Sequence, residues 1–356
     1  MKAAVYHGPR DVRVESVPEP GALGPEEILL KVRSGGICGT DAGEYVYGPK
    51  HLPINTRHQA SGHQGPLIIG HEIFGTIDSV GSNVEHLRVG DRIVPGAGMW
   101  CGSCDWCKAG KTNLCESYYT LGLQANGGLA ELVNVPARMC QVVPAGCNDV
   151  SASVAQPLAV ALHAVRRGRV QAGSSVAIIG VGGIGFFILA GALSYAASPI
   201  AVVDIEPDRL AAADAFGATV ALNPEKLDAA EALLEMIDGV GFDVVFEASG
   251  AEPSAALAQR VVRRGGTVVL VGLHKEPRAF DVTDLVIREV ELVSTLAHVC
   301  DVDLPESLQL LTDDRLAPTA LDREIELDAI VDEGLEPLAA GGVSGKIVVG
   351  IAPSAS

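Results

Sequence analysis

The sequence predicts an α/β protein with two domains, one mostly β and one built from strands and helices that alternate around a parallel sheet. The chain has 356 residues, which at about 150 residues per domain predicts two domains. Short Val/Ile-rich runs broken by Gly and Pro fill residues 1 to about 150, whereas strand-like and helix-like segments alternate from about 175 to 295. Apolar residues make up 48% of the chain and charged residues 20%, which indicates a folded globular protein.

The first part of the chain is predicted to contain strands joined by irregular loops. Residues 27–33 and 92–95 are short Val/Ile-rich runs of strand length. The stretch 45–65 is rich in Gly, Pro, His and Asn and predicts a long loop. Loops of this length inside a compact domain are often functional.

A cluster of cysteines follows, in the pattern Cys101-Gly-Ser-Cys104-Asp-Trp-Cys107, with Cys115 shortly after. Four thiolates at such short spacing can surround one tetrahedral Zn²⁺, which predicts a closed, structural zinc site. The alternatives are four ordinary thiols, two disulfides or an iron–sulfur cluster. The other cysteines besides Cys38 receive no role and are expected to be small buried hydrophobes: Cys140, Cys147 and Cys300.

The segment from Val176 to Val203 has no charged residue and is long enough to cross a bilayer. Its interior predicts a different structure, because a β-branched run meets four closely spaced glycines, then an Ala/Leu/Phe stretch, then Pro199 and a second apolar run. This order is typical of a buried strand, a tight turn, a helix and a second parallel strand. We therefore expect no transmembrane helix here.

The glycines of this turn indicate a dinucleotide site. Such glycines let the backbone approach a pyrophosphate at a helix N-terminus, and a carboxylate some 20 residues further on can bind the adenosine ribose. Asp204 ends the second strand, and together with Glu206 it would repel the 2′-phosphate of NADP, so NAD is preferred. Arg209 would partly offset that repulsion. The alternative is a tight glycine turn with a surface Asp. The glycines are Gly180, Gly182, Gly183 and Gly185.

The remaining elements continue the alternation. Strands are expected at 243–246 and 267–271, and helices at 207–216 and 253–264. A last strand at 345–350 could return to the first domain.

The net charge of −18 opposes binding to nucleic acid or to anionic lipid surfaces. The N-terminus lacks the continuous apolar core of a secretory signal, so we expect a cytoplasmic protein with reduced cysteines.

A dispersed set of residues predicts a second metal site. A thiolate, an imidazole and oxygen groups are what an open catalytic zinc needs, although no local spacing ties them together. The alternative is a structural His-Glu pair at the start of a strand. The set is Cys38, His71, Glu72 and Gln156.

Together these motifs resemble the zinc-dependent medium-chain alcohol dehydrogenases. The segment Gly70-His-Glu-Ile-Phe-Gly75, the four-cysteine lobe and the glycine turn occur in the order of that family, and the resemblance covers essentially the whole chain. The segments 38–41 and 157–163 look most like the butanediol and sorbitol dehydrogenase branch. The resemblance implies a GroES-like β-rich catalytic domain over 1–152 and 297–356, and a doubly wound Rossmann domain over 153–296.

What the family implies about activity is reversible hydride transfer from a secondary alcohol or vicinal diol to NAD, with one catalytic and one structural zinc per chain, in a homodimer or homotetramer. An NAD-binding redox sensor or assembly protein with structural zinc only is the alternative. By position, Cys38 and His71 match zinc ligands of the family, and Glu72 matches the adjacent acid that binds the metal directly or through water. Thr40 matches the hydroxyl that takes the substrate proton. Asp41 matches the carboxylate that orients the imidazole. The matches to cofactor contacts are Ile184, Asp204, Arg209 and Leu273.

Two positions depart from the family pattern. Gln156 stands where this branch has Glu, so the fourth zinc ligand would be a neutral and weaker donor. Gly43 stands where a proton-relay histidine is common, so the relay must end elsewhere, at bulk water or at a histidine of the long loop. The candidates in that loop are His51, His58 and His63.

Overall fold

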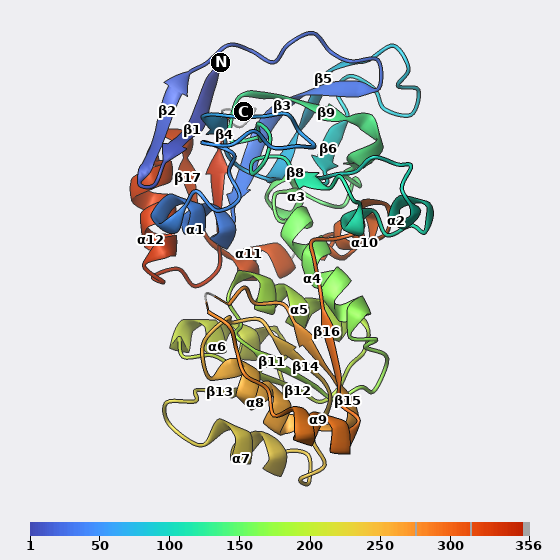
Figure 1. Ribbon diagram of the computed structural model, residues 1–356, viewed down its shortest axis with the longest axis vertical. Coiled ribbons are helices and arrows are strands. Elements are labelled where there is room, and N and C mark those ends of the chain that lie inside the picture. Colours follow the sequence, from blue (N-terminus) through green and yellow to red (C-terminus); the bar gives the residue numbers. More distant parts are fainter. Residues whose placement is uncertain (275, 314, 352–356) are drawn as a thin grey trace. The chain divides into compact units, whose positions relative to one another are not determined.

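The computed structural model describes residues 1–274, 276–313 and 315–351, and the chain divides into two compact units (Figure 1). The terminal unit joins Met1–Gln156 to the segment that begins at His298, and the central unit is Pro157–Ala297. The predicted boundaries after residues 152 and 296 lie close to these divisions.

The terminal unit is built on mainly antiparallel sheets, with one parallel pairing, between β17 and β18. Within the described residues, one sheet has the order β2-β1-β4, a larger one has the order β10-β6-β5-β3-β18-β17 with β9 also on β3, and β7 pairs with β8. The strands are β1 (Lys2–Gly8), β2 (Asp11–Ser16), β3 (Glu27–Ile37), β4 (Leu67–Ile68), β5 (Glu72–Val80), β6 (Arg92–Pro95), β7 (Gly98–Met99), β8 (Tyr119–Thr120), β9 (Leu132–Pro136), β10 (Cys140–Val142), β17 (Leu321–Glu326) and β18 (Lys346–Gly350).

Strand β3 organises this unit. It pairs antiparallel with β5, β9 and β18, and its register sets Gly36 opposite Glu72 and Ile37 opposite Ile347. The prediction that the last strand returns to the first domain is confirmed by the β18–β3 pairing. The end of β3, the start of β5 and the start of β18 therefore lie side by side although they are far apart in sequence.

Short helices connect these strands: α1 (Gly39–Tyr47), α2 (Asp105–Lys108), η1 (Thr112–Leu114), η2 (Ala137–Met139), α3 (Asp149–Ala152), α10 (Cys300–Leu310), α11 (Leu316–Ala320), η3 (Leu327–Ala329), the π-helical η4 (Ile330–Leu335) and α12 (Glu336–Ala339). The predicted loop at 45–65 begins later than expected, because residues 45–47 form the last turn of α1. Buried Tyr45 and Ala42 hold this helix in an apolar cluster with Ile330 and Leu335.

The central unit contains a six-stranded sheet of described residues in the order β13-β12-β11-β14-β15-β16. Its pairings are all parallel, which confirms the predicted parallel sheet. Buried β-branched residues dominate the four-residue strands β11 and β12, as expected for a sheet covered on both faces. The strands are β11 (Val176–Ile179), β12 (Ile200–Val203), β13 (Val220–Leu222), β14 (Phe242–Glu247), β15 (Val262–Leu270) and β16 (Glu291–Ser294).

Helices supply the apolar cover of this sheet. Ala177 and Val203 pack with Leu233 of α7 and Val261 of α8. The helices are α4 (Ala155–Arg167), which begins before the division, α5 (Gly183–Ser194), α6 (Pro207–Phe216), α7 (Ala229–Glu235), α8 (Ser254–Val261) and α9 (Val282–Arg288).

One predicted helix is shorter in the structure. The segment 253–264 was expected to be helical throughout, but α8 ends at Val261 and the next three residues belong to β15. The physical reason is strand pairing, because Val262 lies opposite Phe242 of β14 and is buried there.

Among the described residues, no helix has the length and apolar character needed to span a membrane. The apolar run from Val176 to Val203 instead forms β11, α5 and β12, as predicted.

Candidate functional site

The first candidate site lies at the junction of β3 and α1. Cys38 follows β3 directly, and Thr40 and Asp41 stand in the first turn of α1. The backbone N–H of Cys38 donates to Oδ2 of Asp41 at 2.9 Å, which fixes the start of the helix. The Cys38 sulfur and the Thr40 hydroxyl oxygen are 3.7 Å apart. The sequence thus places a thiol, a hydroxyl and a carboxyl within one helical turn.

Strand β5 brings the other two groups to this turn. His71 precedes β5 and Glu72 begins it, opposite Gly36 of β3. One ligand atom from each of Cys38, His71 and Glu72 lies within 4.8 Å of the others. Three residues that the sequence predicted from dispersed positions are therefore together.

Asp41 faces the imidazole. Its Oδ1 lies 3.5 Å from Nδ1 of His71, and both side chains are buried. A histidine that binds a metal through one ring nitrogen usually directs the other at a carboxylate, which fixes its tautomer and orientation. The arrangement of Asp41 matches the orienting role that the resemblance implies.

Lys346 is part of this cluster and was not predicted. Its Nζ donates to Oε1 of Glu72 at 2.6 Å and to the carbonyl of Ile37 at 2.9 Å, and both side chains of the ion pair are almost fully buried. Oε2 of Glu72 is buried without a hydrogen-bond partner. Lys346 therefore holds one carboxylate oxygen and leaves the other available.

The electrostatics of the cluster favour a cation. Burial lowers the pKa of His71, but Asp41, Cys38 and Glu72 outweigh it and raise the pKa to about 10. Burial raises the pKa of the Cys38 thiol, but His71 more than offsets this and the pKa is lowered. A largely buried set of thiolate, imidazole and carboxylate that attracts positive charge this strongly fits Zn²⁺.

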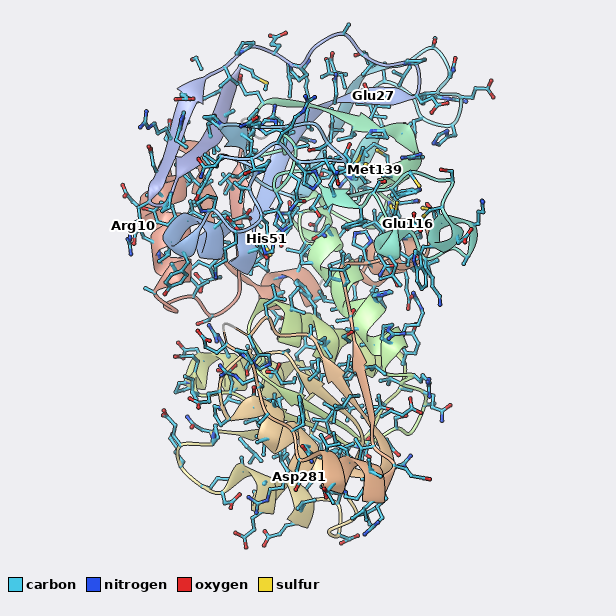
Figure 2. The ribbon with its side chains drawn as sticks, in the orientation of Figure 1. Arg10, Glu27, His51, Glu116, Met139 and Asp281 are labelled. Carbon is cyan, nitrogen blue, oxygen red and sulfur yellow. The ribbon has the colours of Figure 1, made fainter. Side chains whose placement is uncertain are left out.

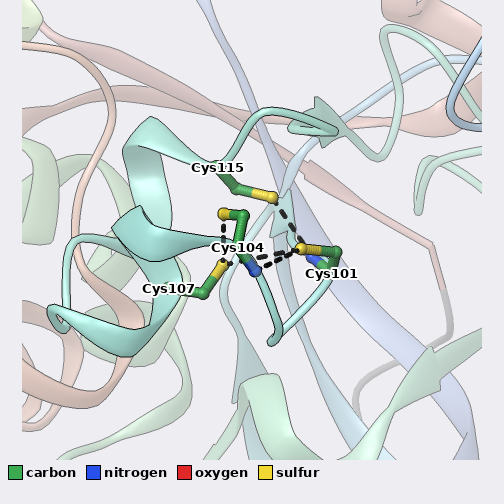
Figure 3. Close-up of side chains that lie close together, drawn as sticks. All are labelled: Cys101, Cys104, Cys107 and Cys115. Atoms are coloured by element: carbon green, nitrogen blue, oxygen red, sulfur yellow. Dashed lines mark hydrogen bonds between the residues drawn. The ribbon is translucent and has the colours of Figure 1, made fainter.

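The four-cysteine lobe is a second candidate metal site in the same unit (Figure 3). The Cys104 and Cys107 sulfurs are 3.5 Å apart, those of Cys101 and Cys107 are 4.0 Å apart, and all four sulfurs lie within 4.8 Å. Tetrahedral thiolates around one Zn²⁺ at about 2.3 Å would lie roughly 3.8 Å from one another. All four cysteines are free thiols, so the disulfide alternative does not hold.

The pKa values of these thiols are unequal. Hydrogen bonds from the hydroxyl and N–H of Ser103 and from the N–H of Cys104 lower the pKa of Cys101 to about 5. Burial raises the pKa of Cys107 to about 12. The backbone N–H of Glu116 lowers the pKa of Cys104. Donors that stabilise thiolates are already arranged around the site, as a zinc ion requires.

The glycine turn of the central unit has the geometry of a dinucleotide site. Gly182 precedes α5 and Gly183, Ile184 and Gly185 form its first turn. A side chain at Gly185 would collide with the carbonyl of Gly180, which explains the glycine there. The N-terminus of α5 carries the free N–H groups that bind phosphate.

Asp204 braces this turn from the end of β12. Its Oδ2 accepts from the N–H of Val181 at 2.8 Å, and its Oδ1 accepts from the N–H of Glu206 at 3.0 Å. Arg209 lies 3.6 Å from Oδ1. The carboxylate therefore has a fixed orientation beside the glycine turn, as a ribose-binding group requires.

The other predicted residues lie as follows. Leu273 follows β15 and is 80% exposed, and Gln156 is buried in the first turn of α4. In the segment after α1, the backbone N–H of His51 donates to buried Glu44, and Figure 2 labels His51 there. The rings of His58 and His63 bond within their own loop, to Ser61 and to the carbonyls of Gly65 and Pro66.

Two segments of the chain match known protein families. Residues 24–145 match the family described as "Alcohol dehydrogenase GroES-like domain", and residues 183–313 match "Zinc-binding dehydrogenase". These matches and the parallel central sheet confirm the predicted combination of a GroES-like β-rich domain and a Rossmann domain.

Several individual proteins are similar over most of the chain. The sorbitol dehydrogenase of Bacillus subtilis is 35% identical over 277 residues, which cover 78% of this chain and 76% of that protein. D-xylulose reductase A of Aspergillus oryzae is 33% identical over 293 residues, which cover 81% of this chain and 80% of the relative.

Two solved structures extend the likeness. The 2R,3R-butanediol dehydrogenase of Bacillus subtilis superposes with a TM-score of 0.91 at 30% identity, over 99% of each chain. A zinc-binding dehydrogenase of Sinorhizobium meliloti bound to NADP superposes with a TM-score of 0.88 at 29% identity, over 98% of each chain.

Proposed function

We propose that this chain, which belongs to the zinc-dependent medium-chain alcohol dehydrogenases, oxidises a secondary alcohol or vicinal diol to the ketone with NAD. It would also catalyse the reverse reaction. Membership of the family makes the chain an oxidoreductase that uses zinc and a nicotinamide cofactor. The observation that carries the proposal is the cluster of half-buried Cys38 with buried His71 and Glu72, which is typical of an open zinc site.

Cys38 and His71 would hold the catalytic zinc, with Glu72 or Gln156 completing the donor set. The metal would act as a Lewis acid that lowers the pKa of a substrate hydroxyl and polarises a ketone in the reverse direction. Asp41 orients the imidazole of His71. Cys101, Cys104, Cys107 and Cys115 would hold a second, structural zinc, which gives two zinc ions per chain.

Thr40 is the proposed proton acceptor for the substrate hydroxyl. Its oxygen lies 3.7 Å from the Cys38 sulfur, so a hydroxyl bound next to that sulfur would be within reach of it. No histidine follows at Gly43, and the rings of His58 and His63 are engaged within their loop. Of the alternatives given above, bulk water and His51 remain as the end of the relay.

The cofactor is proposed to be NAD. Its pyrophosphate would bind at the glycine turn and the N-terminus of α5, and its adenosine ribose at Asp204. The negative charge of Asp204 disfavours the 2′-phosphate of NADP. Arg209 beside Asp204 has the opposite effect, and one similar structure is bound to NADP, so the affinities for both cofactors have to be measured.

The substrate class is supported by the relatives. Sorbitol, D-xylulose and 2R,3R-butanediol name the substrates of the similar proteins, and all three carry neighbouring oxygen functions on adjacent carbons. We therefore place this enzyme among dehydrogenases of small diols and polyols.

The test is oxidation of 2,3-butanediol, sorbitol and xylitol, each with NAD and with NADP, followed by the absorbance of the reduced cofactor. Cys38→Ser and His71→Ala should abolish turnover and leave NADH binding nearly unchanged. Loss of NADH binding in either variant would contradict the role of the cluster. Absence of turnover in the wild-type protein, with NADH still bound, would favour the alternative, an NAD-binding protein with structural zinc only.

A further inference from the structure

A second buried charge lies in the central unit, at the end of β14. Glu247 is fully buried. Its Oε1 accepts three hydrogen bonds, from the N–H and hydroxyl of Ser249 and from the N–H of Gly250, at 2.8–2.9 Å. Its Oε2 accepts from Nε2 of His274 at 2.8 Å. This carboxylate joins the turn after β14 to the turn after β15.

Backbone hydrogen bonds also join the turn after β14 to the turn after β15. The carbonyl of Glu247 accepts from the N–H groups of Val271 and Gly272 at 2.8 and 2.9 Å. A side chain at Gly272 would collide with the N–H of Gly250 and with the Glu247 carboxylate. The two turns are therefore in direct contact, and little space remains for either of them to shift.

The ring of His274 has a fixed protonation pattern. The guanidinium Nε of Arg278 donates to Nδ1 of His274 at 3.3 Å, so Nδ1 carries the lone pair. The proton then lies on Nε2, which donates it to Glu247. His274 is only 16% exposed at its side chain, whereas its neighbour Leu273 is 80% exposed. The half-buried side chain of His274 thus holds the turn in place, and the neighbouring side chain of Leu273 points into solvent.

These turns lie at the edge of the sheet where a dinucleotide binds. In a parallel sheet the ligand lies across the carboxyl ends of the strands. The glycine turn and Asp204 occupy the ends of β11 and β12, and the strand order continues on the other side of β11 with β14 and β15. The adenosine half of the cofactor would lie at the ends of β11 and β12, so its nicotinamide half would lie at the ends of β14 and β15.

We propose that His274 and Glu247 are positioning residues that fix the turn after β15 as the support for the nicotinamide half of the cofactor. This inference rests on the proposed function, since it requires that a nicotinamide dinucleotide binds. Neither residue needs to contact the reacting atoms, because the hydrogen bonds act through the backbone of residues 271–273.

The test compares NADH and NADPH with ADP-ribose, which lacks the nicotinamide ring, in titrations of the full-length holoenzyme. His274→Ala should weaken binding of the preferred reduced cofactor about tenfold, since a hydrogen bond to a buried charge contributes on that order. Binding of ADP-ribose should change less than about twofold, because its contacts lie at β11 and β12. His274→Gln should restore most of the affinity, because the Gln amide can donate where Nε2 donates and accept from Arg278.

A matched pair of acids provides the control. Glu247→Gln removes the buried charge, whereas Glu252→Gln changes an exposed acid on the same turn and should leave both affinities unchanged. Equal weakening of reduced cofactor and ADP-ribose in His274→Ala, or no weakening of either, would overturn the inference. If the wild-type protein binds neither NADH nor NADPH, the proposed function fails and this inference fails with it.

Discussion

The imidazole Nδ1 of His71 lies 3.5 Å from Oδ1 of Asp41, with both side chains buried. A metal-binding histidine usually directs one ring nitrogen at a carboxylate and binds the metal through the other, so this contact fits a role of His71 as a zinc ligand. Because the second carboxylate oxygen of Asp41 accepts from the N–H of Cys38, one side chain orders both proposed ligands.

Asp41→Asn should therefore weaken the catalytic zinc site without removing a ligand. Loss of such an orienting carboxylate typically costs about 10–100-fold in metal affinity or activity. The measurement is competition with a chelator together with kcat. Asp78→Asn, in a surface ion pair with Lys31, serves as the control and should behave as the wild type. Equal zinc affinity in the Asp41 and Asp78 variants would contradict the orienting role.

Lys346→Met should destabilise the terminal unit. The substitution leaves Glu72 buried without its ion-pair partner, which costs about 3 kcal/mol in the free energy of unfolding. The control is Lys31→Met, which breaks an exposed pair with Asp78 and should cost less than about 1 kcal/mol. Denaturant unfolding monitors both variants. Adding Glu72→Gln to Lys346→Met should recover part of the loss, and failure to recover any would show that the charge of Glu72 is not its cause.

Asp204→Asn should relax the discrimination between the two cofactors. Asn keeps an acceptor for the N–H of Val181 but removes the charge that repels a 2′-phosphate. We expect the ratio of NADPH to NADH dissociation constants to fall about tenfold, the effect of about 1.4 kcal/mol. Asp208→Asn changes an exposed acid in the first turn of α6 and is the matched control. An unchanged ratio in Asp204→Asn would count against the ribose assignment.

In the metal-free protein, Cys101 and Cys107 should react at different rates, because the pKa values of their thiols differ. With a pKa of about 5, Cys101 is a thiolate at higher pH, whereas Cys107, with a pKa of about 12, keeps its proton. In chelator-treated protein at about pH 6, alkylation mapped by mass spectrometry should modify Cys101 before Cys107, because the thiolate is the nucleophile. Zinc should protect both residues. Faster modification of Cys107 would contradict this assignment.

The parts of the protein that local sequence determines were predicted well. The spacing of the four cysteines predicts their lobe, and the glycine turn is predicted from its place between a strand and a helix, with Asp204 at the end of the next strand. The helix predicted at 253–264 was too long, because its last residues pair with β14, a contact that helical periodicity does not reveal.

The contacts that were missed join distant parts of the chain. Lys346 is 274 residues from Glu72 and reaches it only because β18 and β5 both pair with β3. His274 and Glu247 are brought together by neighbouring parallel strands. The sequence shows a Lys at the start of a terminal strand and a His after another strand, and neither carries a local signal of its partner.

The most direct test of the central claim is the zinc content per chain, measured by elemental analysis of protein purified without chelator. We expect two zinc ions in the wild type and one in His71→Ala, since the four-cysteine lobe keeps its own ion. One zinc in the wild type, with the same value in His71→Ala, would contradict a catalytic zinc at Cys38 and His71.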